Sequence, residues 1–90
     1  MSALEIERAL LTHPDVVEAA VVGVADARRG QVPKAFIVAR RSGAAFDAEL
    51  QAHVKTHLSR HEYPRVIEVV DALPKTPAGK VNRKALRDRA

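Results

Sequence analysis

The segment 73–83, Leu-Pro-Lys-Thr-Pro-Ala-Gly-Lys-Val-Asn-Arg, constrains the fold of this chain more than any other stretch. Pro74 and Pro77 each lack a backbone N–H and fix φ at about −65°, which excludes a helix interior and a central strand. Gly79 permits a positive φ directly before Lys80, which favours a shaped loop that presents the lysine outward. Because such loops are also common on protein surfaces, composition alone leaves a merely solvated lysine as the alternative.

Length and composition predict one small domain, residues 1–90. A chain of this size buries about 60–65% of its unfolded surface. It has no cysteine, so neither a disulfide nor a thiolate metal site supports it, and the core must be aliphatic. No apolar run approaches the roughly 20 residues of a membrane span, and the N-terminus lacks a basic-then-apolar leader. We therefore expect a soluble, cytoplasmic protein.

The positive charge is concentrated near the C-terminus. Residues 1–74 carry nine Lys and Arg against ten Asp and Glu, whereas residues 75–90 carry six against one. A net charge of +4 raises nucleic acid as a partner class. A cluster of basic residues in one segment of the chain instead suits a local anionic ligand, such as the phosphates of a nucleotide.

Hydrophobic periodicity predicts three strands and three helices in an α+β arrangement. The short link between the first two strands favours an antiparallel pair, and we expect an antiparallel-type sheet flanked by helices. The predicted elements, in order, are a helix that begins after a Ser2–Glu5 capping box and ends before Pro14, strands at 16–24 and 32–40, a helix capped by Asp47 and ended by Tyr63 and Pro64, a strand at 65–71, and a short helix capped by Asn82.

The first predicted helix has a clear inner and outer face. Ile6 and Leu10 recur at helical spacing and should face the core. The charged residues Glu5, Glu7 and Arg8 are expected to face water.

Several ordered blocks of the chain resemble the adenylate-forming (AMP-binding) enzymes. The segment 73–83 resembles their C-terminal lysine motif, residues 2–23 resemble the opening of their small C-terminal domain, and residues 28–36 resemble its next block. The segment 61–65, His-Glu-Tyr-Pro-Arg, narrows the likeness to acyl-CoA synthetases of the medium-chain and aryl-acid type. The resemblance implies a three-stranded sheet with packed helices and a hairpin that carries the lysine.

The resemblance implies a catalytic role for Lys80 and a loop-shaping role for Gly79. When a carboxylate attacks the α-phosphorus of ATP, negative charge accumulates, and a preorganised ammonium group stabilises the transition state. A lysine is a compact charge on a long stem, able to reach phosphate and carboxylate oxygens together. The neighbouring Lys75, Arg83 and Lys84 are expected to tune the local field or to be solvated.

The resemblance also implies a surface for coenzyme A (CoA). Arg29 and the Tyr63, Pro64 and Arg65 step correspond to residues that hold CoA in similar synthetases, and Lys55 fits the same surface. Guanidinium and ammonium groups pair with phosphates, and an aromatic edge beside them packs on adenine. The alternative is that the charges are solvated and that the tyrosine seals a helix end.

Three histidines, His53, His57 and His61, lie along one side of the second predicted helix. Two histidines at this spacing can bind zinc, but no carboxylate or cysteine completes a ligand set in the sequence, and we expect no metal site. Any Mg²⁺ that accompanies ATP is expected to bind mainly through a large N-terminal domain.

The leading hypothesis is the mobile C-terminal domain of an ATP-dependent acyl-CoA synthetase. Such an enzyme converts a carboxylic acid, ATP and CoA into acyl-CoA, AMP and pyrophosphate through an acyl-adenylate. The large N-terminal domain and the hinge are expected partners outside this sequence, so the isolated chain should not turn over. The alternatives are a stand-alone basic module that binds nucleic acid through residues 75–90, or a protein-interaction domain without catalysis. Base-stacking aromatics are missing beside those charges.

Overall fold

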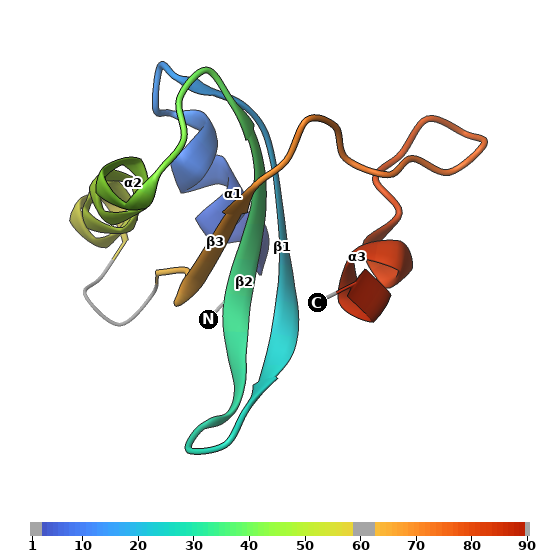
Figure 1. Ribbon diagram of the computed structural model, residues 1–90, viewed down its shortest axis with the longest axis horizontal. Helices are drawn as coiled ribbons and strands as arrows, with labels where there is room; N and C mark the ends of the chain where they lie inside the picture. The colour runs from blue at the N-terminus through green and yellow to red at the C-terminus, as the bar shows by residue number, and fades with distance from the viewer. Residues whose placement is uncertain (1–2, 59–62, 90) are drawn as a thin grey trace.

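The computed structural model describes residues 3–58 and 63–89 and contains the predicted order of elements (Figure 1). The predicted Ser2 cap lies outside the described residues. Within them, no helix has the length and apolar character needed to cross a bilayer. The elements are α1 (Ala3–Leu11), β1 (Val16–Asp26), β2 (Gly30–Ala39), α2 (Ala44–His57), β3 (Val66–Val69) and α3 (Arg83–Arg89).

The three strands form a mixed sheet in the order β1-β2-β3. β1 and β2 pair antiparallel down to Asp26 and Gly30 at the tip of their turn, as the short link predicted. β3 runs parallel to β2, so the expectation of a wholly antiparallel-type sheet is wrong for this strand. The reason is that α2 lies between the two strands and carries the chain back to the same end of the sheet before β3 begins.

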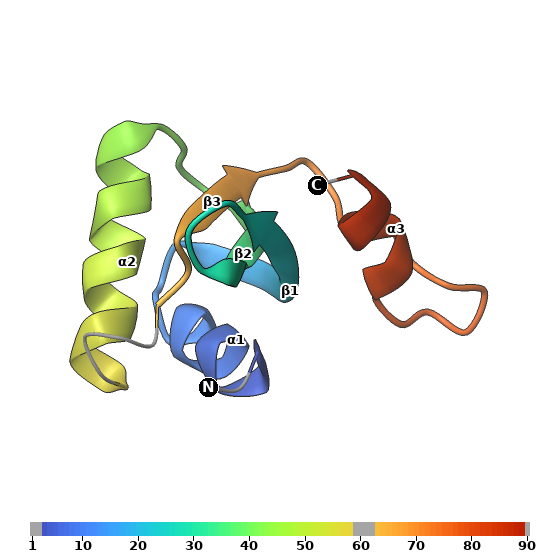
Figure 2. The ribbon, with the colours of Figure 1, turned by 90° about the horizontal axis from the view of Figure 1, so that it is seen from below.

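The sheet is buried on both faces (Figure 2). Alternation along β1 places Ala19 and Val21 on the face covered by α1 and α2, and Ala20 and Val22 on the face covered by α3. A strand that is buried on both faces has a nearly continuous apolar sequence, which explains why β1 is rich in valine. The α3-side core consists of Ala20, Val22, Phe36, Leu73 and Leu86.

Two acidic residues lie where the sequence analysis did not place them. Glu7 was expected to face water but is 7% exposed, because its carboxylate turns toward the edge of β1. Asp47 is not the cap of α2, because the helix begins at Ala44 after Gly43, whose φ is 113°. The earlier start brings Phe46 into the core. One Asp47 oxygen is buried without a partner, and burial raises the pKa of this carboxyl group.

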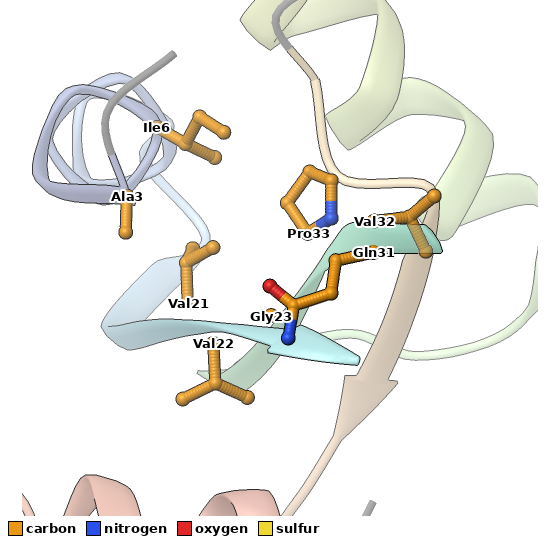
Figure 3. Close-up of a pocket in the computed structure, with 8 residues that line it drawn as sticks. All are labelled: Ala3, Ile6, Val21, Val22, Gly23, Gln31, Val32 and Pro33. Atoms are coloured by element: carbon orange, nitrogen blue, oxygen red, sulfur yellow. The ribbon is translucent and has the colours of Figure 1, made fainter. Parts of the chain in front are cut away.

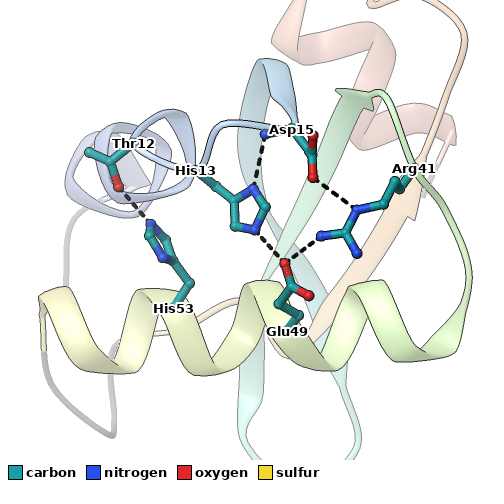
Figure 4. A network of polar contacts seen from close by, with 6 residues as sticks. All are labelled: Thr12, His13, Asp15, Arg41, Glu49 and His53. Carbon is teal, nitrogen blue, oxygen red and sulfur yellow. Dashed lines mark hydrogen bonds and ion pairs between the residues drawn. The ribbon is translucent and has the colours of Figure 1, made fainter.

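A polar network joins the end of α1 to α2 and to the end of β2 (Figure 4). The His13 ring is buried, and its Nδ1 accepts the Asp15 N–H at 3.1 Å. The ring proton is therefore on Nε2, which donates to Glu49 at 2.5 Å. Arg41 donates to the same Glu49 oxygen at 2.5 Å and to the Asp15 carboxylate at 2.9 Å.

The position of α3 should depend on one side chain. Leu86 is the buried residue of this short helix, which is too short to be stable by itself. We expect Leu86→Ala to lower the free energy of unfolding by about 2–5 kcal/mol. Leu11→Ala, the same change at a side chain that is 48% exposed, should stay within about 0.5 kcal/mol. Urea denaturation followed by circular dichroism measures both, and equal effects would contradict the assignment.

The network at Glu49 predicts a pH dependence of stability. His13, and then Arg41, lower the pKa of Glu49 below its ordinary value of 4.5. A carboxyl group whose pKa is depressed by folding stabilises the protein above its unfolded pKa, and the contribution disappears as the pH falls through the folded pKa. Glu49→Gln should therefore lower the melting temperature at pH 7, and the difference from wild type should narrow below pH 4.5. A difference that is the same at pH 7 and pH 3 would rule this out.

Candidate functional site

Residues 75–81 form a hairpin that carries Lys80, which we call the lysine hairpin. A bridge between Lys75 and Val81 closes it. Inside it, the Thr76 N–H donates to the Lys80 carbonyl at 2.7 Å, and the Gly79 N–H donates to the Thr76 carbonyl at 2.8 Å. Gly79 has φ 84° with open space around its Cβ position, so the backbone conformation itself favours glycine there. The predicted loop geometry is confirmed.

Lys80 is exposed on the returning leg of this hairpin, opposite Thr76 and directly after the turn at residues 77–79. In Figure 1 the hairpin projects from the body of the domain beside α3. Within the described residues, none of the ion pairs involves the Lys80 ammonium group. The lysine is therefore available to a second body, and it is not locked inside the interior of this domain.

The base of the lysine hairpin is fixed to the sheet on both sides. Leu73 before it and Leu86 after it are buried in the α3-side core. The Asn82 N–H donates to the Pro74 carbonyl at 2.8 Å, which holds the two ends together. The Asn82 side chain also accepts the Ala85 N–H at 3.1 Å, so the predicted cap of α3 is confirmed. A flexible side chain is thus carried by a restrained backbone.

Two charged residues at this base were expected to tune the local field or to be solvated, and both form ion pairs within the domain. Lys75 donates to Glu18 of β1 at 2.8 Å. Arg83 donates to both oxygens of Glu7, at 2.5 and 2.9 Å, and this carboxylate raises the pKa of Arg83. Sequence reasoning missed Glu7 because it borders the apolar stripe of α1, and its partner lies at the other end of the chain.

Three of the residues assigned to CoA form a compact group, the Tyr63 cluster, made of Lys55, Tyr63 and Arg65. The Lys55 ammonium lies 4.1 Å from the centre of the Tyr63 ring, and the Arg65 guanidinium carbon lies 4.4 Å from it. Arg65 also donates to the Tyr63 hydroxyl. A cation at such a distance from an aromatic face gains a cation–π interaction of about 0.5–1 kcal/mol at an exposed site.

The backbone beside the Tyr63 cluster is held by the sheet and by α2. Pro64 is fully buried, and its carbonyl accepts a hydrogen bond from the Gln51 side chain at 3.0 Å. The Arg65 N–H donates to the Pro33 carbonyl at 3.0 Å. The two basic side chains of the cluster therefore project from a fixed backbone.

Arg29 lies in the turn between β1 and β2. The Arg28 and Arg29 N–H groups donate to Asp26 at 2.8 and 3.0 Å and lower the pKa of this carboxyl group, with smaller contributions from the charges of Arg29 and Arg65. The Arg29 side chain is 53% exposed. Figure 1 shows this turn and the lysine hairpin at different ends of the molecule. The lysine hairpin and the turn that holds Arg29 therefore lie in separate parts of the domain.

The histidines of α2 are engaged in hydrogen bonds. The His53 ring contacts the Thr12 hydroxyl at 2.6 Å, and His57 Nδ1 donates to the His53 carbonyl at 2.9 Å. Burial, with the nearby rings of His57 and His13, lowers the pKa of His53. His61 lies outside the described residues. Within residues 3–58 and 63–89, no group of three potential ligands could hold a metal ion.

A small hollow lies between α1 and the β1–β2 pair, with a volume of about 180 Å³ (Figure 3). Its lining is mainly aliphatic, with the Gln31 amide as its polar group. None of the predicted site residues borders it, so we place the candidate site on the exposed loops. The lining residues are Ala3, Ile6, Val21, Val22, Gly23, Gln31, Val32 and Pro33.

Known sequences share most of this chain. Residues 5–80 match the family described as the AMP-binding enzyme C-terminal domain. The chain is 48% identical over 89 residues to a mitochondrial acyl-coenzyme A synthetase of Rattus norvegicus, and 49% identical over 90 residues to a benzoate–CoA ligase of Thauera aromatica. These alignments cover 93% and 97% of this chain but 15% and 17% of the two relatives.

The fold is shared as well. The acyl-CoA synthetase of Brucella canis superimposes with a TM-score of 0.94 at 46% identity, over 99% of this chain and 17% of that one. The present chain therefore spans about one sixth of the length of the proteins it matches. With the mixed sheet, the lysine hairpin and the matched residues 5–80 in agreement, the chain belongs to the family of AMP-binding enzyme C-terminal domains.

Proposed function

We propose that this chain is the mobile C-terminal domain of an ATP-dependent acyl-CoA synthetase, with Lys80 as the residue that promotes adenylate formation. The observation that carries the proposal is an exposed ammonium group on a hairpin whose base is fixed to the sheet. The names of the relatives, acyl-CoA synthetases and benzoate–CoA ligases, support the reaction class.

In the first half-reaction, a carboxylate oxygen attacks the α-phosphorus of ATP, and the bond to the pyrophosphate oxygen breaks. Lys80 would place its ammonium group beside the oxygens on which negative charge increases. A hairpin held at its base limits the entropy lost when the lysine is placed in a nucleotide cleft. The cleft, the acyl pocket and the residues that hold Mg²⁺ would belong to a large N-terminal domain, the partner of this chain.

In the second half-reaction, the CoA sulfur attacks the acyl carbon of the adenylate, and AMP leaves. Arg29, Lys55 and Arg65 would pair with CoA phosphates, while Tyr63 and Pro64 shape the surface beside them. Because the β1–β2 turn that holds Arg29 and the lysine hairpin lie at different ends of the domain, one orientation would not serve both half-reactions. A rotation of the domain between the two steps follows from this separation.

The nucleic-acid alternative is weakened by internal ion pairs. Within residues 75–90, Lys75 pairs with Glu18, and Arg83 pairs with Glu7. Arg89 pairs with Glu68 at 2.8 Å. Half of the six basic side chains in this segment thus face carboxylates of the same domain, which reduces the charge available to a phosphate backbone.

The Lys80 assignment is tested in the enzyme assembled with its large N-terminal domain. Lys80→Ala should slow pyrophosphate exchange, which reports adenylate formation, by about 10²–10³-fold. Thioester formation from supplied acyl-adenylate and CoA should change little, because Lys80 is then not at the reacting atoms. Lys84→Ala removes an exposed lysine of the adjacent helix α3 and is the matched control. Equal loss of both half-reactions, or equal effects of the two substitutions, would refute the assignment.

The assignment of Arg29 to CoA binding is tested by substituting two adjacent arginines in turn. Arg29→Ala should raise the KM for CoA about tenfold, as expected for the loss of one charge-assisted phosphate contact, and should leave pyrophosphate exchange unchanged. Arg28→Ala, in the same exposed turn, should leave the KM for CoA within about twofold. If the two substitutions have the same effect on CoA, Arg29 has no specific role in binding it.

A further inference from the structure

At Val21, two side chains bind the outer edge of β1 in the way that a neighbouring strand would. β1 is at the edge of the sheet, where backbone N–H and C=O groups lack a strand partner. The Val21 N–H donates to Glu7 at 2.9 Å, and Arg83 donates to the Val21 carbonyl at 3.1 Å. Glu7 and Arg83 also bind each other through two hydrogen bonds. The three residues form a closed ring of contacts, which we call the edge clamp.

The edge clamp is directly connected to the lysine hairpin. Arg83 is the first residue of α3 and stands three positions after Lys80. Asn82, between them, holds the start of the hairpin through the Pro74 carbonyl. On the other leg, Lys75 is paired with Glu18, two residues into the same strand. Both legs of the hairpin are therefore attached to β1.

The edge clamp can fix the orientation of the lysine hairpin, which apolar packing alone leaves free. Leu73 and Leu86 fix how deeply the hairpin base is buried, but apolar contacts are non-directional and leave the orientation of the hairpin undetermined. A guanidinium paired with a carboxylate through two parallel hydrogen bonds fixes a plane as well as a distance. The Glu7 side chain is 9% exposed, so water competes weakly for this carboxylate, and the Arg83 side chain is 38% exposed.

We propose that Glu7 and Arg83 are positioning residues that orient the lysine hairpin on the edge of β1 and so determine where the Lys80 ammonium group is presented. This inference deepens the proposed function and rests on it. The two side chains act through the backbone of the hairpin and touch no reacting atom. A displacement of about 1 Å at the reacting groups costs up to about 10²-fold in rate, so releasing the clamp should slow adenylate formation while Lys80 remains in place.

The test uses a double substitution designed to keep the domain folded. Removing Arg83 alone would leave the Glu7 carboxylate buried without its charge partner, which is strongly destabilising. In the double variant Glu7→Gln with Arg83→Met, the pair is neutral, and the glutamine oxygen still accepts the Val21 N–H. Arg89→Ala is the control, because it removes an arginine of the same helix that is paired with an exposed carboxylate.

The first readout is amide hydrogen exchange in the chain itself. The N–H groups of Thr76, Gly79 and Asn82 are bonded within or across the lysine hairpin and report its order. In the double variant these amides should exchange at least about tenfold faster, while amides in the β1–β2 ladder keep their protection. In the Arg89→Ala variant the hairpin amides should exchange as in wild type.

The second readout compares the rates of the two half-reactions in the assembled enzyme. The double variant should slow pyrophosphate exchange about 10–100-fold and leave thioester formation from supplied acyl-adenylate within about twofold. Unchanged hairpin exchange together with unchanged pyrophosphate exchange would overturn the inference. A parallel loss of both half-reactions and of protection throughout the sheet would also overturn it, since the pair would then only hold the fold together.

Failure of this inference and failure of the proposed function are distinguishable. If Lys80→Ala leaves pyrophosphate exchange intact, the proposed function fails, whatever the double variant does. If Lys80→Ala abolishes exchange while the double variant behaves like Arg89→Ala, the proposed function stands and the positioning role of Glu7 and Arg83 is refuted.

Discussion

The ring of contacts between Glu7, Val21 and Arg83 ties α3 and the base of the lysine hairpin to the edge of β1. It joins α1, the edge strand and α3, which lie on both sides of the sheet and at both ends of the chain. A buried carboxylate is tolerated here because a backbone N–H and a guanidinium satisfy it. The same contacts occupy the N–H and C=O groups of Val21 on this edge strand, which would otherwise remain open to another chain.

The arrangement around the sheet explains how so small a domain could serve two chemical steps. α1 and α2 cover one face, and α3 with the base of the lysine hairpin covers the other. The Tyr63 cluster is attached to α2 and β3, and Arg29 to the β1–β2 turn. Each group of residues is presented from a fixed backbone, so under the proposed function a change of orientation of the whole domain would exchange one group for the other without refolding either.

Local patterns in the sequence predicted the features that local physics determines. The prolines and Gly79 predicted a shaped, exposed loop around Lys80, the valine runs predicted the strands, and Asn82 predicted its helix cap. That this loop is a hairpin was implied by the family resemblance. The parallel direction of β3 and the early start of α2 were not predicted, because both depend on how the helix packs on the sheet. The pairing of Glu7 with Arg83 was also missed, since no local pattern connects residues so distant in the chain. The roles of Lys80 and of the residues assigned to CoA follow from family resemblance, and they stay predictions.

The most direct test of the central claim is a lysine footprint of the assembled enzyme. Reductive methylation, read by mass spectrometry, compares the reactivity of Lys80 with that of Lys84 in the presence of different ligands. The account predicts that a carboxylic acid together with an ATP analogue that resists cleavage at its α-phosphorus protects Lys80 and leaves Lys84 reactive. With AMP and CoA in their place, Lys80 should become reactive again. Equal reactivity of Lys80 under both conditions would contradict the claim that this ammonium group enters the nucleotide cleft for one step and leaves it for the other.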